Sequence, residues 1–179
     1  MKATGIVRRI DELGRVVIPK EIRRAFHIRV GDALEIYTDN DGDVIFKMFS
    51  PVGDLGKYAK DYTDALSKAT DKIVIVCDRD KCIAASGNKK ASFINRPVAG
   101  GLDDIVGQRQ FYEYNEGDSY SNALDGVESF IVAAAPIISA GDILGAVALI
   151  SPESSGKCTK TEKELLTVAA SFFAGLLSE

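Results

Sequence analysis

The chain has 179 residues, of which 46% are hydrophobic and 27% charged, and its formal net charge is −4. This length predicts one large domain or two small ones, and the composition is typical of a globular protein. Pro136, Gly141 and Asp142 interrupt the longest apolar runs, which excludes a transmembrane helix of about 20 residues there.

Positive charge is concentrated at one end of the chain. Residues 1–30 contain eight basic and three acidic side chains, a net charge of +5, whereas residues 31–179 carry a net charge of −9. Such a reversal indicates that the two parts have separate roles. The acidic average of the whole chain therefore does not exclude a nucleic-acid partner for its first part.

The cysteines bear on the cellular compartment. Cys77, Cys82 and Cys158 are few and odd in number, which predicts reduced thiols in a cytoplasmic protein rather than a disulfide framework. Neither an apolar stretch nor a small-residue cleavage site follows Lys2, so we expect no secretory signal there.

The first 50 residues are predicted to form a small β-rich domain. Pro19 suits the first turn of a helix, and Asp41-Gly42 suits a tight hairpin turn. A domain this small buries too little apolar surface to be stable alone, so we expect an obligate dimer. The alternative is a monomeric module that leans on the rest of the chain. The predicted elements are strands over 3–10 and 15–19, a helix over 19–28 and a hairpin over 33–49.

Residues 51–55 are predicted to be a short linker to a second domain, residues 56–179, which combines helices with an antiparallel sheet. The hairpin near its end is apolar on both faces, which predicts a central place in the sheet. Residues 87–126 show no pattern that assigns them. The predicted elements are a helix over 55–70, strands over 72–77, 81–86, 128–139 and 143–151, and a helix over 161–179.

The predicted last helix has more apolar surface than one packing face requires. Thr161 and Glu164 have the spacing of a capping box at its start. Of its two apolar stripes, one suffices for packing within the domain, and we favour a contact between subunits through this helix; the alternative is burial of both stripes within the domain. The two stripes are Leu165, Ala169, Phe172 and Leu176, and Leu166, Ala170, Phe173 and Leu177.

The basic end has the chemistry of a DNA-binding surface. Duplex DNA is densely charged, and the planar fork of arginine binds phosphate oxygens or a guanine edge through two hydrogen bonds. Arg15 follows the turn at Gly14, and Arg23 and Arg24 lie about 100° apart on the predicted helix. The alternative is that these arginines only solvate an amphipathic helix and a strand edge.

A resemblance favours DNA binding. The segment TGIVRRIDELGRVVIPKEIRRAF, with DALEIY after it, resembles the N-terminal DNA-binding domain of the AbrB family of transition-state regulators. The resemblance implies a dimer in which two chains interleave swapped hairpins. It also implies that Arg8, Arg15, Arg23 and Arg24 contact double-stranded DNA, with Lys2 and Arg9 as weaker candidates for supporting contacts.

The second domain resembles the GAF fold in its order of elements. The combination of an AbrB-like and a GAF-like domain in one chain resembles a group of sporulation regulators. This resemblance implies a nucleoid-associated tetramer that activates and represses forespore genes. GAF domains often bind a small molecule, and the resemblance implies a possible unidentified effector. Aromatic candidates for its pocket are Phe111, Tyr112, Tyr114 and Tyr120, unless these residues close the core.

Two other functions are considered and disfavoured. A thiol-dependent GAF enzyme that reduces methionine sulfoxide needs an activated cysteine, and no basic cluster surrounds Cys77 or Cys82. An AbrB-like antitoxin ends in a disordered acidic tail, whereas this chain ends in an apolar helix. His27 is the only histidine and lies in the first domain. We therefore expect no cofactor, no metal and no enzymatic activity.

Overall fold

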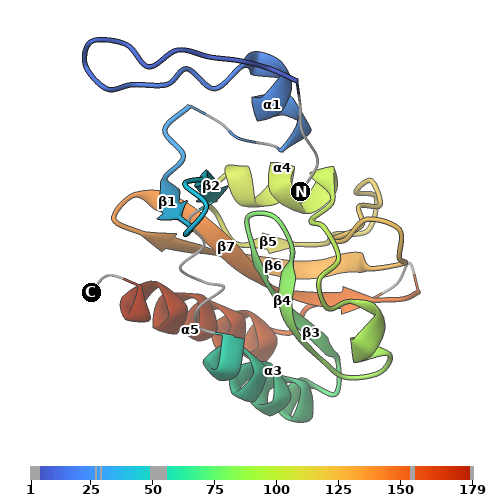
Figure 1. The fold of residues 1–179 in the computed structure, drawn as a ribbon. Coiled ribbons are helices and arrows are strands. Elements are labelled where there is room, and N and C mark those ends of the chain that lie inside the picture. The colour runs from blue at the N-terminus through green and yellow to red at the C-terminus, as the bar shows by residue number, and fades with distance from the viewer. Residues whose placement is uncertain (1–4, 27, 29, 49–55, 154–155, 178–179) are drawn as a thin grey trace. The chain divides into compact units, whose positions relative to one another are not determined.

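The computed structural model describes residues 5–26, 28, 30–48, 56–153 and 156–177. The chain divides into two compact units, Met1–Phe49 and Ser50–Glu179. Each unit is described by itself below, with the elements labelled as in Figure 1. The predicted linker over residues 51–55 lies outside the described residues.

The first unit contains one short helix and one hairpin. Helix α1 (Lys20–Ala25) has Pro19 as its N-cap and Phe26 as its C-cap, so it is shorter at both ends than the predicted helix over 19–28. Strands β1 (Leu34–Thr38) and β2 (Val44–Met48) pair antiparallel. Gly42 takes a positive φ of 86° in the turn between them, where a side chain would be strained. The predicted hairpin and its turn are confirmed.

The two strands predicted before α1 are not present in the single chain. Residues 5–10 and 15–19 have no regular secondary structure, and the segment turns back at residues 12–14. Strands need a hydrogen-bonding neighbour to be stable, and no described strand of this unit pairs with these residues. Their apolar side chains are consequently exposed, with Val7 at 84% and Val17 at 72%.

The second unit is built on a five-stranded antiparallel sheet. The strands lie in the order β4-β3-β7-β6-β5, so that β7 is central, as predicted. Their bounds are β3 (Ile73–Asp78), β4 (Cys82–Ser86), β5 (Tyr112–Glu113), β6 (Phe130–Ser139) and β7 (Asp142–Ser151).

Helices cover both faces of this sheet (Figure 1). Helices α3 (Gly56–Thr70) and α5 (Lys160–Leu176) pack on one face, and α4 (Gly100–Gly107) packs on the other. A short 3-10 helix, η1 (Lys90–Ser92), follows β4. Among the described residues, no helix combines the length and apolar character needed to cross a bilayer.

Two hydrophobic cores result from the alternation of side chains along the strands. In β3, Val74 and Val76 join the core under α3 and α5, whereas Ile73, Ile75 and Cys77 join the core under α4. All six residues of this strand are buried. The apolar runs of the sequence are therefore strands with covered faces on both sides.

Helix α5 is capped by Thr159, two residues before the predicted cap Thr161. The Thr159 side chain accepts a hydrogen bond from the Glu162 amide at 3.2 Å, and Glu162 accepts one from the Thr159 amide at 2.7 Å. Thr161 and Glu164 have the same sequence spacing. The earlier pair is used because Lys72 Nζ lies 2.8 Å from the Glu162 carboxylate and also donates to the Lys157 carbonyl at 2.7 Å.

We expect stability to depend on pH through Glu162. Burial would raise the pKa of this carboxyl, but hydrogen bonds from Lys72 and Thr159 outweigh it and hold the pKa below its usual 4.5. Ionised Glu162 thus stabilises the fold above about pH 4.5, and this stabilisation is lost as the pH falls through the lowered pKa. At pH 7, Glu162→Gln should lower the free energy of unfolding by about 1–3 kcal/mol.

Urea unfolding of both proteins between pH 3 and 7 measures this effect. The difference in the free energy of unfolding between wild type and Glu162→Gln should decrease as the pH is lowered toward 3. Glu164→Gln is the matched control, because its carboxylate is 66% exposed and lies 4.0 Å from Lys160, which predicts a change below about 0.5 kcal/mol. Equal losses in both variants would contradict the role given to Glu162.

Candidate nucleic-acid interface

Arg15 is positioned by a carboxylate that caps its own turn. Asp11 Oδ1 accepts hydrogen bonds from the backbone amides of Leu13 at 3.0 Å and Arg15 at 2.8 Å. Asp11 Oδ2 accepts one from Arg15 Nε at 2.8 Å. These contacts, led by the Arg15 amide, lower the pKa of Asp11. The Arg15 side chain is nevertheless 70% exposed, so the turn presents a guanidinium to solvent.

The sequence analysis did not assign a role to Asp11. Its signal is the segment Asp11-Glu-Leu-Gly-Arg15, in which an aspartate precedes a glycine by three positions. An aspartate at that place closes a turn by accepting backbone amides, and Gly14 supplies the positive φ of 76°. The pattern therefore pairs an anchoring carboxylate with a presented arginine.

The other predicted DNA contacts are also in the first unit. Arg23 and Arg24 occupy the last turn of α1, the first half-buried and the second exposed. Arg8 and Arg9 are exposed, and Arg8 Nη1 donates to the Val7 carbonyl at 3.2 Å. Lys2 lies outside the described residues.

The first unit has no buried core in the single chain. None of its described residues is fully buried. Large apolar side chains of the hairpin instead face solvent. The most exposed of these are Ile36 at 62%, Val44 at 57% and Phe46 at 46%.

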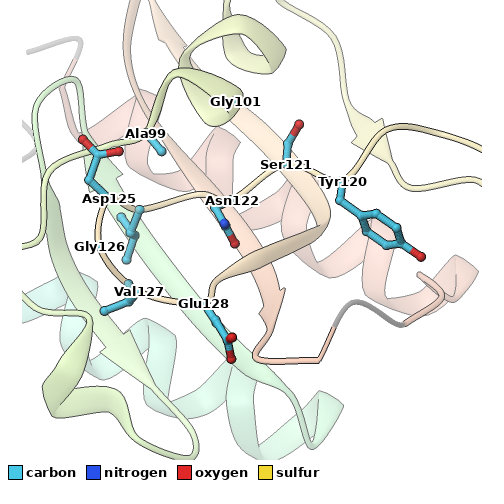
Figure 2. A pocket seen from close by; sticks show the side chains of 10 residues that line it. Ala99, Gly101, Tyr120, Ser121, Asn122, Asp125, Gly126, Val127 and Glu128 are labelled. Carbon is cyan, nitrogen blue, oxygen red and sulfur yellow. The ribbon is translucent and has the colours of Figure 1, made fainter.

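The second unit has an open polar hollow of about 560 Å³ between the start of α4 and the loop before β6. Figure 2 shows Asn122 and Glu128 on this loop, and Tyr120 at its edge. The residues around it are Ala99, Gly101, Tyr120, Ser121, Asn122, Leu124, Asp125, Gly126, Val127 and Glu128.

Only one of the four aromatic candidates lines this hollow. Tyr120 does so and is 64% exposed. Phe111 and Tyr114 pack against the core under α3 and α5, and Tyr112 packs against the core under α4. Three of the four therefore close the core, which was the alternative considered for them.

The thiols lack the features of an activated nucleophile. Cys77 and Cys82 are buried, and the pKa of Cys77 is raised well above its usual range. Burial, with help from the carboxylates of Glu162 and Glu113, also raises the pKa of Cys158. Among the described residues, no three histidine, cysteine or acidic side chains gather as metal ligands do.

Comparison with known proteins identifies the family. The family described as "Stage V sporulation protein T C-terminal, transcription factor" matches residues 54–177. Stage V sporulation protein T of Bacillus subtilis (strain 168) is 44% identical over 177 residues, which cover 97% of each chain. The chain belongs to the stage V sporulation protein T family. The resemblance to sporulation regulators is thereby confirmed.

The two units of this family member have separate relatives. Transition state regulatory protein AbrB of B. subtilis is 61% identical over 51 residues, which are 28% of this chain and about half (52%) of AbrB. A second family, described as "Antidote-toxin recognition MazE, bacterial antitoxin", matches residues 7–46. These matches confirm the predicted AbrB-like class of the first unit.

The second unit has the GAF fold. The crystal structure of the Thermosynechococcus elongatus PixJ GAF domain aligns with a TM-score of 0.53 at 11% identity, covering 73% of this chain and 89% of that domain. The predicted fold class, an antiparallel sheet with flanking helices, is confirmed.

Proposed function

We propose that this member of the family binds double-stranded DNA through residues 1–50 and regulates transcription during sporulation. The observation that carries the proposal is the agreement of two features. The chain matches a transcription-factor family over residues 54–177, and its first unit carries a net charge of +5 over residues 1–30. Activation and repression of forespore genes, at the nucleoid in the cytoplasm, are part of this proposal.

DNA binding uses a dimer of the first unit in this proposal. Residues 5–10 and 15–19, which form no strand in the single chain, would gain strand partners from a second chain, and the exposed hairpin residues Ile36 and Phe46 would gain a core. Interleaved hairpins meet both needs. Pairing also brings two copies of Arg15 and its neighbours onto one surface, where they neutralise phosphates together.

A second contact, through α5, would make the assembly a tetramer. Leu166, Ala169, Ala170 and Phe173 are buried within the domain, whereas Phe172 is 41% and Leu176 39% exposed. Tyr58 on α3 adds another exposed ring at 56%. An exposed apolar face across two neighbouring helices is typical of a subunit interface.

A small-molecule effector remains part of the proposal for the second domain. The hollow beside Tyr120 is large enough for a small ligand, although it is more polar than most ligand pockets. An effector there would change DNA affinity only by its different affinity for two arrangements of the protein.

The two disfavoured functions have specific observations against them. The MazE match is confined to residues 7–46, and the residues after it fold into a domain instead of an acidic tail. Enzymatic thiol chemistry is disfavoured because the pKa values of Cys77 and Cys158 are raised, which reduces the thiolate needed for attack.

Titration of the full-length protein against labelled duplex DNA over a range of salt concentrations tests the proposal. About eight phosphate contacts from a dimer predict a slope near −7 for log affinity against log salt. Binding that is absent at low ionic strength, or that does not weaken with salt, would contradict DNA binding by this surface.

A further inference from the structure

Cys77 and Cys82 are cross-strand partners at the end of the β3–β4 hairpin. Their Cα atoms are paired across a bulge between Val76 and Cys77. Antiparallel partners have Cα atoms about 4.5–5.5 Å apart, which lies within the range of about 4.4–6.8 Å that a disulfide spans. Both side chains enter the same core, under α4. The register and the shared side-chain direction of the two cysteines therefore suit a disulfide.

The two thiols contact one another inside this core. Cys82 Sγ donates to the Ala84 carbonyl at 3.3 Å, which leaves the Cys77 thiol as the donor toward the Cys82 sulfur. That hydrogen bond, burial and the charge of Asp78 raise the pKa of Cys77. The side chains are 1% and 0% exposed. The pair is thus preassembled but shielded, and an oxidant reaches it only when the hairpin end opens locally.

We propose that Cys77 and Cys82 form a redox-sensitive dithiol that low-molecular-weight disulfides close to a Cys77–Cys82 disulfide. One sulfur, as thiolate, attacks the oxidant and forms a mixed disulfide, releasing one small thiol. The second sulfur then displaces the other small thiol. The chain loses two hydrogen atoms, and the oxidant is reduced to two thiols.

The turn that this disulfide would lock supports one wall of the polar hollow. Asp78 Oδ1 accepts the backbone amides of Asp80 and Lys81 at 2.8 and 2.7 Å, which shapes the turn between the two cysteines. The Asp80 carbonyl accepts the Val98 amide at 2.8 Å, and the Pro97 carbonyl accepts the Asp125 amide at 2.9 Å. Asp125 lines the hollow. Closure of the dithiol therefore acts on a turn that is hydrogen-bonded through one short segment to the hollow.

The test uses the full chain with Cys158→Ser, which removes intermolecular exchange through the third thiol. The folded protein is incubated with oxidised glutathione, and the intact mass and the number of thiols that are alkylated after denaturation are followed. We expect a loss of two hydrogen atoms, two thiols protected together, and full recovery with dithiothreitol. Trypsin cuts after Arg79 and Lys81, so the two half-peptides should stay joined until reduction.

Two further variants separate a dithiol from single reactive cysteines. With Cys77→Ala or Cys82→Ala added, the loss of two hydrogen atoms should disappear, and any product should be a glutathione adduct. Two outcomes overturn the proposal: both thiols still being alkylated on denaturation after prolonged oxidation of the folded Cys158→Ser protein, or a glutathione adduct on that protein that never resolves to the internal disulfide. Neither readout depends on DNA binding.

Discussion

Replacing Arg15 by Ala is expected to weaken duplex-DNA binding by the full-length protein by about a hundredfold. Each chain of the proposed dimer would lose one charge-assisted hydrogen-bonding group, worth about 1.5 kcal/mol, and two such losses multiply to about two decades in affinity. The salt dependence should also become shallower by about two, because two fewer phosphates are neutralised. Fluorescence anisotropy at several salt concentrations measures both quantities.

Three variants show whether the loss belongs to this side chain. Arg15→Lys keeps the charge without the planar fork, so it should recover part of the affinity and restore the salt slope. Arg23→Ala should weaken binding in the same direction. Lys68→Ala removes one exposed positive charge from α3 and should leave binding unchanged. Retained DNA affinity in both arginine-to-alanine variants, with the fold intact, would contradict their assignment.

The predicted strands of the second unit were correct where the chain is buried on both sides. The runs around Ile75, Ala133 and Leu149 are so apolar that only an element with two covered faces accommodates them, and each is a strand with covered faces. Residues 87–126 gave no such pattern, because α4 has only eight residues and β5 two. Such short elements depend on hydrogen bonds to residues distant in the sequence. One example is the hydrogen bond that the Ala99 amide donates to the Ala123 carbonyl at 2.9 Å.

In the first unit, the sequence patterns predict strands that the single chain does not form. The alternation of Ile6 and Ile10 with basic residues is typical of a half-buried strand, yet both side chains are exposed in the single chain, Ile6 at 39% and Ile10 at 69%. The proposed dimer accounts for this difference, because a strand is stable only with its neighbour. The Asp11–Arg15 contact was missed for another reason: turns that use a carboxylate carry no hydrophobic periodicity.

Phe173→Ala is expected to lower the free energy of unfolding by about 3–5 kcal/mol, because a fully buried aromatic ring leaves a cavity when it is removed. Phe173 on α5 is 0% exposed, packs with Tyr62 of α3 at a ring-centroid distance of 5.5 Å and belongs to the core between these helices and the sheet. Urea unfolding at matched protein concentrations measures the loss, because association would otherwise add to the apparent stability.

A variant at the neighbouring residue, Phe172, distinguishes an effect on folding from an effect on association. Phe172 is 41% exposed and stacks on Tyr62 at 5.2 Å, so Phe172→Ala should cost only about 0.5–1.5 kcal/mol in folding. If α5 forms the proposed subunit contact, the same variant should shift native mass from tetramer to dimer, because Phe172 is one of the exposed apolar side chains of this helix. A fold that tolerates Phe172→Ala with no change in assembly would remove α5 from the interface. Losses as large as those of Phe173→Ala would instead mean that both apolar stripes serve the core of a single domain.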